Sequence, residues 1–571
     1  MKIKYKIIMT TSIMLSIIAI LVCAFMLSIY FFVFKTNIKF DVNMVSAESS
    51  SPDIKIKWDS DDYLSKIKVD IKYHGKLISS YTTTDPIVLK SEEYIVKACY
   101  GKVDVTVTGY RGWYNYTQRF KTDVYANTYN IAPLVATMPV TLFTLKLDEI
   151  TVNNTIPTFV WFDRGNVWNY NYAPSCVFTM PGITASQLNW NGRTTMYEET
   201  GKYISELYSI NPNSFFNYYI NDIWSYGYYK NIIANNIPMS NHTLTMITDG
   251  TATSELYNQY FNNEDDTLND KNYNDIKEKI EQIKTDFVNY NGKDYLEIRD
   301  NGKLSCYDFA EIGSYFFVLA NEQENAKLWI NNATAYAPNS AKYKNLIRNN
   351  PNVEIYNFNT LLNEYTYQEK LQLKNLLGFA DDCFSEAQKN NKEVMIVLGT
   401  ANDYEGNMDK YVKALKTYYG DKYLYYYKGH PGYPTYRYDG KSQNLKDMGL
   451  IEIDATVPAE FYLFFNPKAI SSGYSSTTFD TVVEGCGGGL FESRLKDTDL
   501  NRYEGKIEFT MTYVDKTDSE HDNEFDELCQ SDSYVILEFL DTTDKDISIF
   551  DLNTSTFTSY RKNADDTYTR I

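Results

Sequence analysis

Residues 244–250 read LTMITDG, an apolar strand candidate that ends in an Asp-Gly turn. Similar apolar runs stand at 159–162 and 394–398. A helix candidate at 276–287 places its apolar residues on one face. Apolar strands that alternate with amphipathic helices are typical of parallel sheets flanked by helices. We therefore expect two such sheets, one at about residues 136–385 and one from about residue 386 to the acidic tail that ends at residue 571.

Strict alternation of apolar and polar residues precedes these segments. It recurs in three runs, at 54–58, 67–73 and 103–107. Period-two patterning in β-branched residues predicts strands, here those of a small β-sandwich at about residues 41–135. The polar composition at its start, about residues 41–60, is typical of a linker. The region holds no catalytic cluster, so its expected role is that of a spacer or a carbohydrate-facing accessory domain.

The N-terminus resembles a membrane segment. Three lysines within the first six residues precede a predominantly apolar run at 7–34 that carries no charge. About 20 apolar residues span a bilayer, so this run is long enough to cross one. The alternative is a cleaved signal peptide, with small residues at 45–47 as the cleavage site, but typical h-regions are only about 7 to 15 residues long. We therefore expect an uncleaved signal-anchor within residues 1–40 and a membrane-anchored, single-pass chain.

The charges around this run bear on its orientation. The lysines ahead of it favour a cytoplasmic N-terminus, whereas Lys35 and Lys39 on the far side reduce that bias. The side of the membrane on which the body lies therefore stays open.

The composition indicates several folded domains. The chain has 571 residues, 43% of them hydrophobic and 16% aromatic, and at about 150 residues per domain this length predicts three or four units. A net charge of −19 repels phosphate backbones and argues against nucleic acid as a partner. The seven cysteines form no CxxC pair, so a zinc site has no support. Buried free thiols are expected, with disulfides as the alternative for an extracytoplasmic body.

Asp249, in the LTMITDG segment, is a candidate general base. An Asp at the carboxyl end of a strand, followed by Gly250, can direct its carboxylate into the crevice where doubly wound sheets bind ligands. Asp-Gly is also among the commonest turn dipeptides, so the segment alone favours a plain turn.

Two further segments carry candidate phosphate-binding groups. The aromatic strand candidate YLYYYKGHP, at 423–431, delivers Lys428 and His430 to a Gly and Pro turn. A protonated imidazole there can stabilise or protonate a departing phosphate, while the alternative is a structural histidine that caps the turn. The segment AISSGYSSTTFDTVV, at 469–483, crowds the hydroxyl groups of 475–478 at the start of a helix candidate. They suit either a phosphate cradle or ordinary N-capping.

These segments stand in a specific order. Residues 365–407, reading YTYQEKLQLKNLLGFADDCFSEAQKNNKEVMIVLGTANDYEGN, are followed by YKGHPG and SGYSSTTF. Together they resemble the C-terminal half of the bacterial sialyltransferases of glycosyltransferase family 80. In that family a helical linker precedes a strand, a Gly-Thr turn, a Glu-Gly-Asn motif, a KGHP turn and a Ser-Ser pair. LTMITDG is similar to the family's Asp-Asp-Gly segment, and the resemblance covers about residues 240–490.

The resemblance implies a GT-B fold, in which two Rossmann-like domains face a cleft, behind an immunoglobulin-like domain such as some members carry. It implies inverting transfer of sialic acid from CMP-sialic acid to a galactoside, without a metal or other cofactor. Carried over by position, Asp249 deprotonates the acceptor hydroxyl and His430 assists the departing CMP phosphate. Glu460 binds the cytidine ribose, and Tyr404 lies near the acceptor sugar. The other implied donor-binding residues are Gly399, Thr400, Lys428, Gly429, Pro431, Ser475 and Ser476.

Several departures from the family pattern keep other functions open. Thr248 replaces the first Asp of the Asp-Asp-Gly pair, one extra residue stands in the turn that holds Tyr404, and Gly432 and Tyr433 replace the basic and Gly residues that often follow KGHP. A transferase for another CMP-linked sugar, such as Kdo or a related nonulosonic acid, is therefore the first alternative. A surface glycan-binding or adhesion protein is the second, because tyrosines stack on sugars. An extracytoplasmic body would also be separated from bacterial CMP-sugars, which are made inside the cell.

Overall fold

The chain divides into two compact units. The first comprises Met1–Tyr129, Asn154–Pro157 and Lys202–Phe215, and the second comprises the rest. The computed structural model describes nearly all residues of 2–36, 38–60, 64–83, 93–111, 114–162, 168–179, 190–222, 226–248, 260–288, 317–331, 350–399, 407–430, 441–473, 490–495, 503–505, 534–538 and 546–571, together with Ser476 and Thr478.

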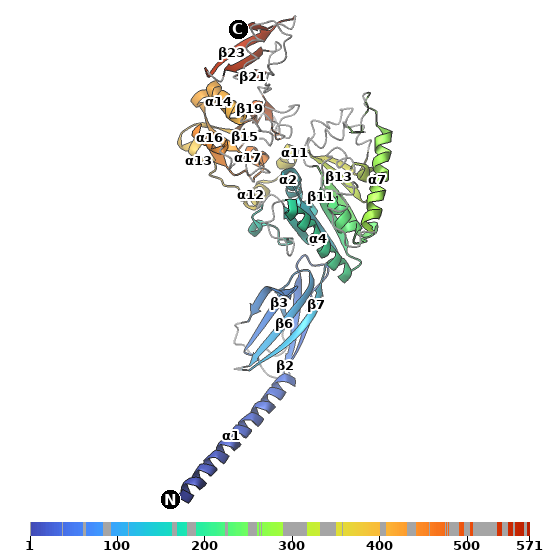
Figure 1. The fold of residues 1–571 in the computed structure, drawn as a ribbon, viewed down its shortest axis with the longest axis vertical. Helices are drawn as coiled ribbons and strands as arrows, with labels where there is room; N and C mark the ends of the chain where they lie inside the picture. Colours follow the sequence, from blue (N-terminus) through green and yellow to red (C-terminus); the bar gives the residue numbers. More distant parts are fainter. Residues whose placement is uncertain are drawn as a thin grey trace. The chain divides into compact units, whose positions relative to one another are not determined.

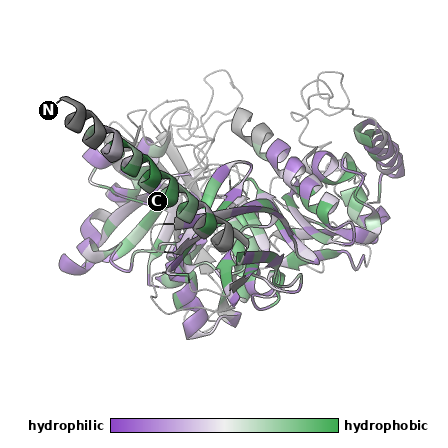
Figure 2. Cartoon of the chain, turned by 90° about the horizontal axis from the view of Figure 1, so that it is seen from below, coloured by the Kyte–Doolittle hydropathy of each residue, from purple (hydrophilic) through white to green (hydrophobic). Residues whose placement is uncertain are grey.

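The first unit begins with α1 (Lys2–Thr36), a single helix of 35 residues. Its stretch Met9–Ile29 is apolar and unburied, and it is long enough by length and composition to cross a membrane. Figure 2 colours this part of the helix as hydrophobic. A membrane anchor and a signal sequence near the N-terminus both have these properties.

Two antiparallel sheets follow α1, with strand orders β1-β2-β5 and β4-β3-β6-β7 (Figure 1). The strands are β1 Ile38–Met44, β2 Asp53–Ser60, β3 Lys66–Tyr73, β4 Lys76–Thr82, β5 Glu93–Lys97, β6 Gly101–Arg111 and β7 Tyr114–Val124. The apolar residues of the predicted alternation, among them Ile56, Val69 and Val105, are buried, which confirms that pattern. Phe40 of β1 stacks on Tyr116 of β7, so the two sheets share a core.

The predicted linker at about residues 41–60 is wrong. Strand β1, the turn at 45–52 and strand β2 occupy this stretch, and the strands pair from Ile38 opposite Ser60 to Met44 opposite Ile54. Buried and exposed residues alternate along β1. The serines at 49–51 that suggested a linker lie in the turn between the two strands, and the polar residues within β1 face outward, as expected for a strand of period two.

The second unit contains a seven-stranded sheet of order β10-β9-β8-β11-β12-β13-β14. Its described pairings, such as β11 with β12 and β12 with β13, are parallel, as expected. The strands are β8 Thr128–Leu134, β9 Thr158–Phe162, β10 Val177–Thr179, β11 Phe215–Asn221, β12 His242–Ile247, β13 Ala326–Asn331 and β14 Val353–Tyr356. The helices around it are α2 Thr137–Leu145, α3 Leu147–Ile150, α4 Trp190–Ile210, α5 Tyr226–Tyr228, α7 Asp270–Val288 and α11 Phe358–Glu364. The predicted apolar face of 276–287 is buried in α7.

A second sheet has the order β17-β16-β15-β18-β19-β20. The pairings among its first four strands are parallel, and the pairings of β18 with β19 and of β19 with β20 are antiparallel. Its strands are β15 Glu393–Leu398, β16 Tyr423–Lys428, β17 Ile451–Ile453, β18 Ile470–Gly473, β19 Leu490–Leu495 and β20 Tyr503–Gly505. Its helices are α12 Tyr367–Leu376, α13 Ser385–Lys389, α14 Asn407–Tyr419, α16 Lys441–Asp447 and α17 Ala459–Phe465. The tail forms an antiparallel sheet of β21 Tyr534–Glu538, β22 Asp546–Asp551, β23 Thr556–Lys562 and β24 Tyr568–Arg570.

One apolar cluster joins the carboxyl ends of both sheets. The last residues of several parallel strands belong to it, namely Leu134, Phe162, Ile247, Leu398 and Ile453. In α/β sheets the carboxyl ends of the strands are where ligands bind. The same core therefore supports the edge of each sheet at which the candidate residues stand.

His242, the first residue of β12, is a structural histidine. Its side chain is fully buried, Nδ1 lies 2.8 Å from the carbonyl oxygen of Pro238, and Nε2 lies 3.2 Å from the hydroxyl of Tyr228. A neutral ring satisfies both contacts, because Nδ1–H donates to the carbonyl and Nε2 accepts from the hydroxyl. Burial lowers the pKa of His242 in the folded chain.

This lowered pKa predicts a loss of stability in acid. As the pH falls through about 6.5, the usual histidine pKa, the unfolded chain binds the proton before the folded chain does. At pH 5.5 the loss from this residue is at most about 1.4 kcal/mol. We expect His242→Gln to lower the melting temperature at pH 7.5 but to show a smaller further drop at pH 5.5 than the wild type. Circular dichroism melts at the two pH values check this, and equal drops would assign the acid sensitivity to another group.

Candidate functional site

The predicted donor-side residues stand at the carboxyl ends of neighbouring strands. Gly399 follows β15, Gly429 and His430 follow β16, and Ser476 stands shortly after β18. β15 pairs in parallel with both β16 and β18. Because parallel strands end at the same edge of a sheet, the backbone brings these residues to one edge.

Gly399 is in close contact with the turn that carries His430. Its N–H donates to the carbonyl oxygen of Lys428 over 2.9 Å. A Cβ at residue 399 would lie 2.7 Å from the Tyr427 hydroxyl, 3.2 Å from Cα of Gly429 and 3.2 Å from the His430 nitrogen. Only glycine fits here without moving this turn.

Lys428 stabilises the same turn through hydrogen bonds of its side chain. Its side chain is buried, and its ammonium donates to the carbonyl oxygens of Gly429 over 3.2 Å and of Ala455 over 3.0 Å. Two carbonyl partners compensate part of the cost of burying a charge. Lys428 therefore ties the loop after β16 to the loop after β17.

Glu460 is a buried carboxylate next to this edge. It lies in the first turn of α17, a helix that begins after Pro458, and only 4% of the residue is exposed. An acidic side chain in the first turn of a helix is favoured by the unpaired N–H groups there. α17 follows β17, which pairs with β16, so Glu460 comes from the strand-helix unit beside the His430 turn.

Strand β18 and the segment after it contribute hydroxyl groups. Ser472, within β18, hydrogen-bonds to the buried hydroxyl of Tyr411 on α14, and burial raises the pKa of Tyr411. Ser476 is half-buried, and its Oγ accepts from the N–H of Thr478 over 3.3 Å. This contact spans two residues, as in the local side-chain turns that serine forms.

On the first sheet the structure describes the chain up to Thr248. This residue is buried, and its N–H donates to the carbonyl oxygen of Trp329 over 3.0 Å. The residue after it, Asp249, lies outside the described residues. So do four other predicted site residues, Thr400, Tyr404, Pro431 and Ser475.

Asn221, which the sequence analysis missed, ends the neighbouring strand β11. It pairs in register with Ile247, two residues before Asp249, and it is fully buried. Among the residues that the structure describes, neither its amide nitrogen nor its amide oxygen has a hydrogen-bond partner. A buried amide without partners costs free energy, which a polar ligand at this strand end would recover. The signal in the sequence is the same as for Asp249, a polar residue that ends an apolar strand.

Comparison with known proteins gives matches among solved structures. No family model and no curated protein matches the sequence. The chain is similar to a 2,6-sialyltransferase from Photobacterium sp. JT-ISH-224, solved with the donor product CMP and the acceptor substrate lactose, with 12% identity, a TM-score of 0.45 and coverage of 78% of this chain and 85% of that chain. It is similar to a sialyltransferase from Photobacterium damsela, with 12% identity, a TM-score of 0.43 and coverage of 78% and 88%. It is also similar to an alpha/beta-galactoside alpha-2,3-sialyltransferase from Photobacterium phosphoreum, with 16% identity, a TM-score of 0.44 and coverage of 65% and 92%.

The close contact at Gly399 predicts a sensitive position. Gly399→Ala should displace the His430 turn and lower the turnover of any reaction at this edge by about tenfold or more, since small misplacements of reacting groups are costly. Adding Tyr427→Phe removes the hydroxyl nearest to the new methyl group and should restore part of the loss. Steady-state kinetics of the single and double variants check this. Wild-type turnover in Gly399→Ala would show that the turn does not need its present position.

Proposed function

We propose that the chain is a sialyltransferase of GT-B fold, preceded by an immunoglobulin-like domain. It transfers sialic acid from CMP-sialic acid to a hydroxyl group of a galactoside, with inversion at the anomeric carbon. The reaction uses no metal or other cofactor. The chain is held at a membrane through its N-terminal helix.

The observation that carries this proposal is the assembly at the carboxyl edge of the second sheet. The motifs of the family 80 resemblance are scattered over residues 399–476, yet Gly399, Gly429, His430 and Ser476 follow strands that lie side by side in the sheet. The tight contact of Gly399 with the His430 turn explains why a Gly-Thr turn and a KGHP turn occur together. The common apolar cluster under the carboxyl ends of both sheets is consistent with a GT-B arrangement.

On the donor side, the proposed roles follow from charge. CMP leaves with a phosphate that gains negative charge as the bond to the sugar breaks, and donors aimed at developing charge are among the strongest catalytic devices. His430 supplies a proton or a positive charge to that phosphate. Ser475 and Ser476 bind its oxygens, and Glu460 accepts hydrogen bonds from the ribose hydroxyls.

On the acceptor side, Asp249 takes the proton of the galactoside hydroxyl as it attacks. A carboxylate acts as a general base when it lies within hydrogen-bond reach of that hydroxyl. Asn221, at the end of the adjacent strand, offers an amide that binds a second hydroxyl of the sugar. An attack by the acceptor on the face opposite the departing CMP inverts the anomeric carbon in one step.

The test is a transferase assay with the full-length chain in membranes or detergent. We expect CMP release that depends on both CMP-sialic acid and a galactoside such as lactose, and a product heavier by one sialic acid residue in mass spectrometry. CMP-Kdo in place of CMP-sialic acid tests the donor. Transfer from CMP-Kdo alone would keep the reaction class and change the sugar, while glycan binding without any nucleotide binding would make the chain a lectin or adhesin.

A further inference from the structure

The anchor helix runs into the first strand of the β-module almost without a break. α1 ends at Thr36 and β1 begins at Ile38, so a single residue separates them. α1 also contacts both β1 and β7. A one-residue connection leaves the module little freedom to move away from the helix, unlike the flexible linkers of tens of residues that separate many domains.

The structure also bears on whether α1 is retained. The small residues at 45–47 that would suit a signal peptidase follow β1 in the chain. Cleavage there would remove a strand that pairs with β2 from Ile54 to Ser60 and buries Ile38, Phe40 and Val42 in the core. The carbonyl of Ala47 also accepts the N–H of Asn127. A folded β-module therefore requires the chain on both sides of the cleavage site, which favours a retained helix.

Strand register tells which end of the module lies next to α1. Ile38, at the start of β1, is opposite Ser60, at the end of β2. The next strand, β3, begins at Lys66, which is opposite Tyr110 near the end of β6. The start of β1 and the end of β6 therefore lie at the same end of the module. Tyr110 and Arg111 lead into the hairpin between β6 and β7. We call this end of the module, with Ile38, Ser60, Lys66 and Tyr110, the hairpin end.

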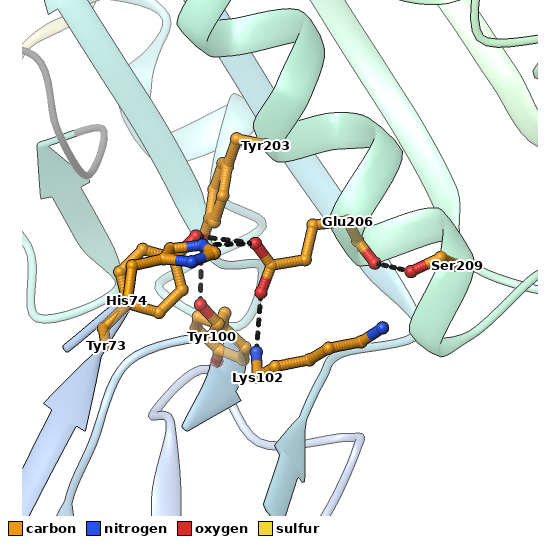
Figure 3. A network of polar contacts seen from close by, with 7 residues as sticks. All are labelled: Tyr73, His74, Tyr100, Lys102, Tyr203, Glu206 and Ser209. Carbon is orange, nitrogen blue, oxygen red and sulfur yellow. Dashed lines mark hydrogen bonds and ion pairs between the residues drawn. The ribbon is translucent and has the colours of Figure 1, made fainter. Parts of the chain in front are cut away.

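The opposite end of the module is already occupied. There the turn between β3 and β4 and the start of β6 surround Glu206 of α4 (Figure 3). The Glu206 carboxylate accepts from the Tyr73 hydroxyl over 2.9 Å and from the Lys102 N–H over 2.7 Å, and it lies 2.9 Å from Nε2 of His74. The end of the module away from the anchor helix therefore packs against α4.

The length of α1 places the hairpin end at the bilayer surface. Met9–Ile29, with 21 residues, spans about 31 Å at 1.5 Å per residue, close to the roughly 30 Å of hydrocarbon in a bilayer. The seven further helical residues up to Thr36 add about 10 Å, while the headgroup region on one side is roughly 5–8 Å thick. Strand β1 therefore starts within a few ångströms of the headgroups.

The chemistry of the hairpin end suits that position. In the sequence, the stretch from the end of β6 to the start of β7, residues 110–114, reads YRGWY, of which Gly112 and Trp113 lie outside the described residues. Lys66 is exposed and its Nζ lies 5.2 Å from the centre of the Tyr110 ring. Tyrosine, tryptophan and basic side chains are the residues enriched at membrane interfaces.

We propose that the hairpin end of the β-module rests in the lipid headgroup layer, so that the module is a rigid membrane-seated base rather than a mobile spacer. The contact depends on the retained helix and on Lys66 and Tyr110 at the hairpin end. This inference is independent of the proposed reaction.

The test compares how deep the two ends of the β3–β4 hairpin lie in the membrane. A fluorescent amino acid replaces either Lys66, at the hairpin end, or Lys76, at the start of β4, in the full-length chain in nanodiscs whose lipids carry a nitroxide on the headgroup. The two positions are separated by about 23 Å along β3, at 3.3 Å per residue, so we expect quenching about threefold or more stronger at 66 than at 76. Asn115 and Asp123, near the two ends of β7, provide a second pair should either variant at 66 or 76 fail to fold.

Equal quenching at both ends, or none at either, would overturn the proposal. Mass spectrometry of the same protein shows whether the N-terminal 47 residues are present. A chain that starts after Ala47 would also overturn it, because the helix that seats the module would be missing.

Discussion

Replacing Asp249 with asparagine should abolish most sialyl transfer, with turnover lower by about 10²–10⁴-fold, the usual worth of a general base. Asparagine keeps the size of the side chain and its capacity to hydrogen-bond, but it does not take up the proton of the acceptor hydroxyl. Because the loss concerns the acceptor side, the affinity for CMP should stay unchanged. Initial rates of product formation together with CMP titrations check both parts of this expectation.

The matched control is Asp270→Asn, in the exposed first turn of α7. It makes the same chemical change on the same sheet domain and should leave turnover at the wild-type level. If Asp249→Asn also keeps full turnover, another group accepts the proton and the acceptor-side assignment is wrong.

His430→Ala should lower turnover by about 10²–10³-fold, comparable to the loss of one donor that stabilises charge developing in a transition state. The effect should appear mainly in kcat, because the phosphate gains its extra charge as the bond to the sugar breaks. His430 is half-buried and follows a strand that stays fixed by Lys428 and Gly399, so the substitution should not unfold the site.

The informative comparison is with His430→Gln, which keeps a hydrogen-bond donor but has no proton to give. An intermediate rate would mean that hydrogen bonding supplies part of the effect and proton transfer the rest. A His430→Ala variant with wild-type kcat and weakened CMP binding would instead assign the residue to ground-state binding alone.

The sequence predicted the regular parts of the fold well, because these depend on local patterns. The apolar strands at 159–162, 244–248 and 394–398 and the apolar face at 276–287 all appear in the structure as β9, β12, β15 and α7. The alternation of the β-module is likewise confirmed by burial. The parallel arrangement followed from the order of strands and helices.

The failure at β1 has a specific cause. Its sequence, IKFDVNM, alternates as a half-buried strand should, but it directly follows the anchor helix and precedes a polar turn. Composition averaged over 41–60 therefore suggested a linker, although the alternation within β1 already contained the strand. The pairing of β1 with β2 depends on contacts that composition does not report.

The candidate site was predictable only in part. Gly399, Lys428, Gly429, His430 and Glu460 were named from motifs, but the contact between Gly399 and the His430 turn could not be predicted, because it joins residues that follow two different strands. The buried bonds of Lys428 to two carbonyls were also not foreseen. Asn221 was missed since a single asparagine at a strand end is common, and only its burial without partners singles it out.

We expect the carboxyl edge of the second sheet to bind a cytidine nucleotide. Calorimetric titration of CMP into the wild type, Glu460→Gln and Glu452→Gln tests this binding, with Glu452→Gln as the control because Glu452 is an exposed glutamate on β17 of the same sheet. We predict saturable binding to the wild type and to Glu452→Gln, and affinity about tenfold or more weaker in Glu460→Gln, as expected for hydrogen bonds to a charged group. No CMP binding to the wild type, or equal affinity in all three proteins, would contradict the claim.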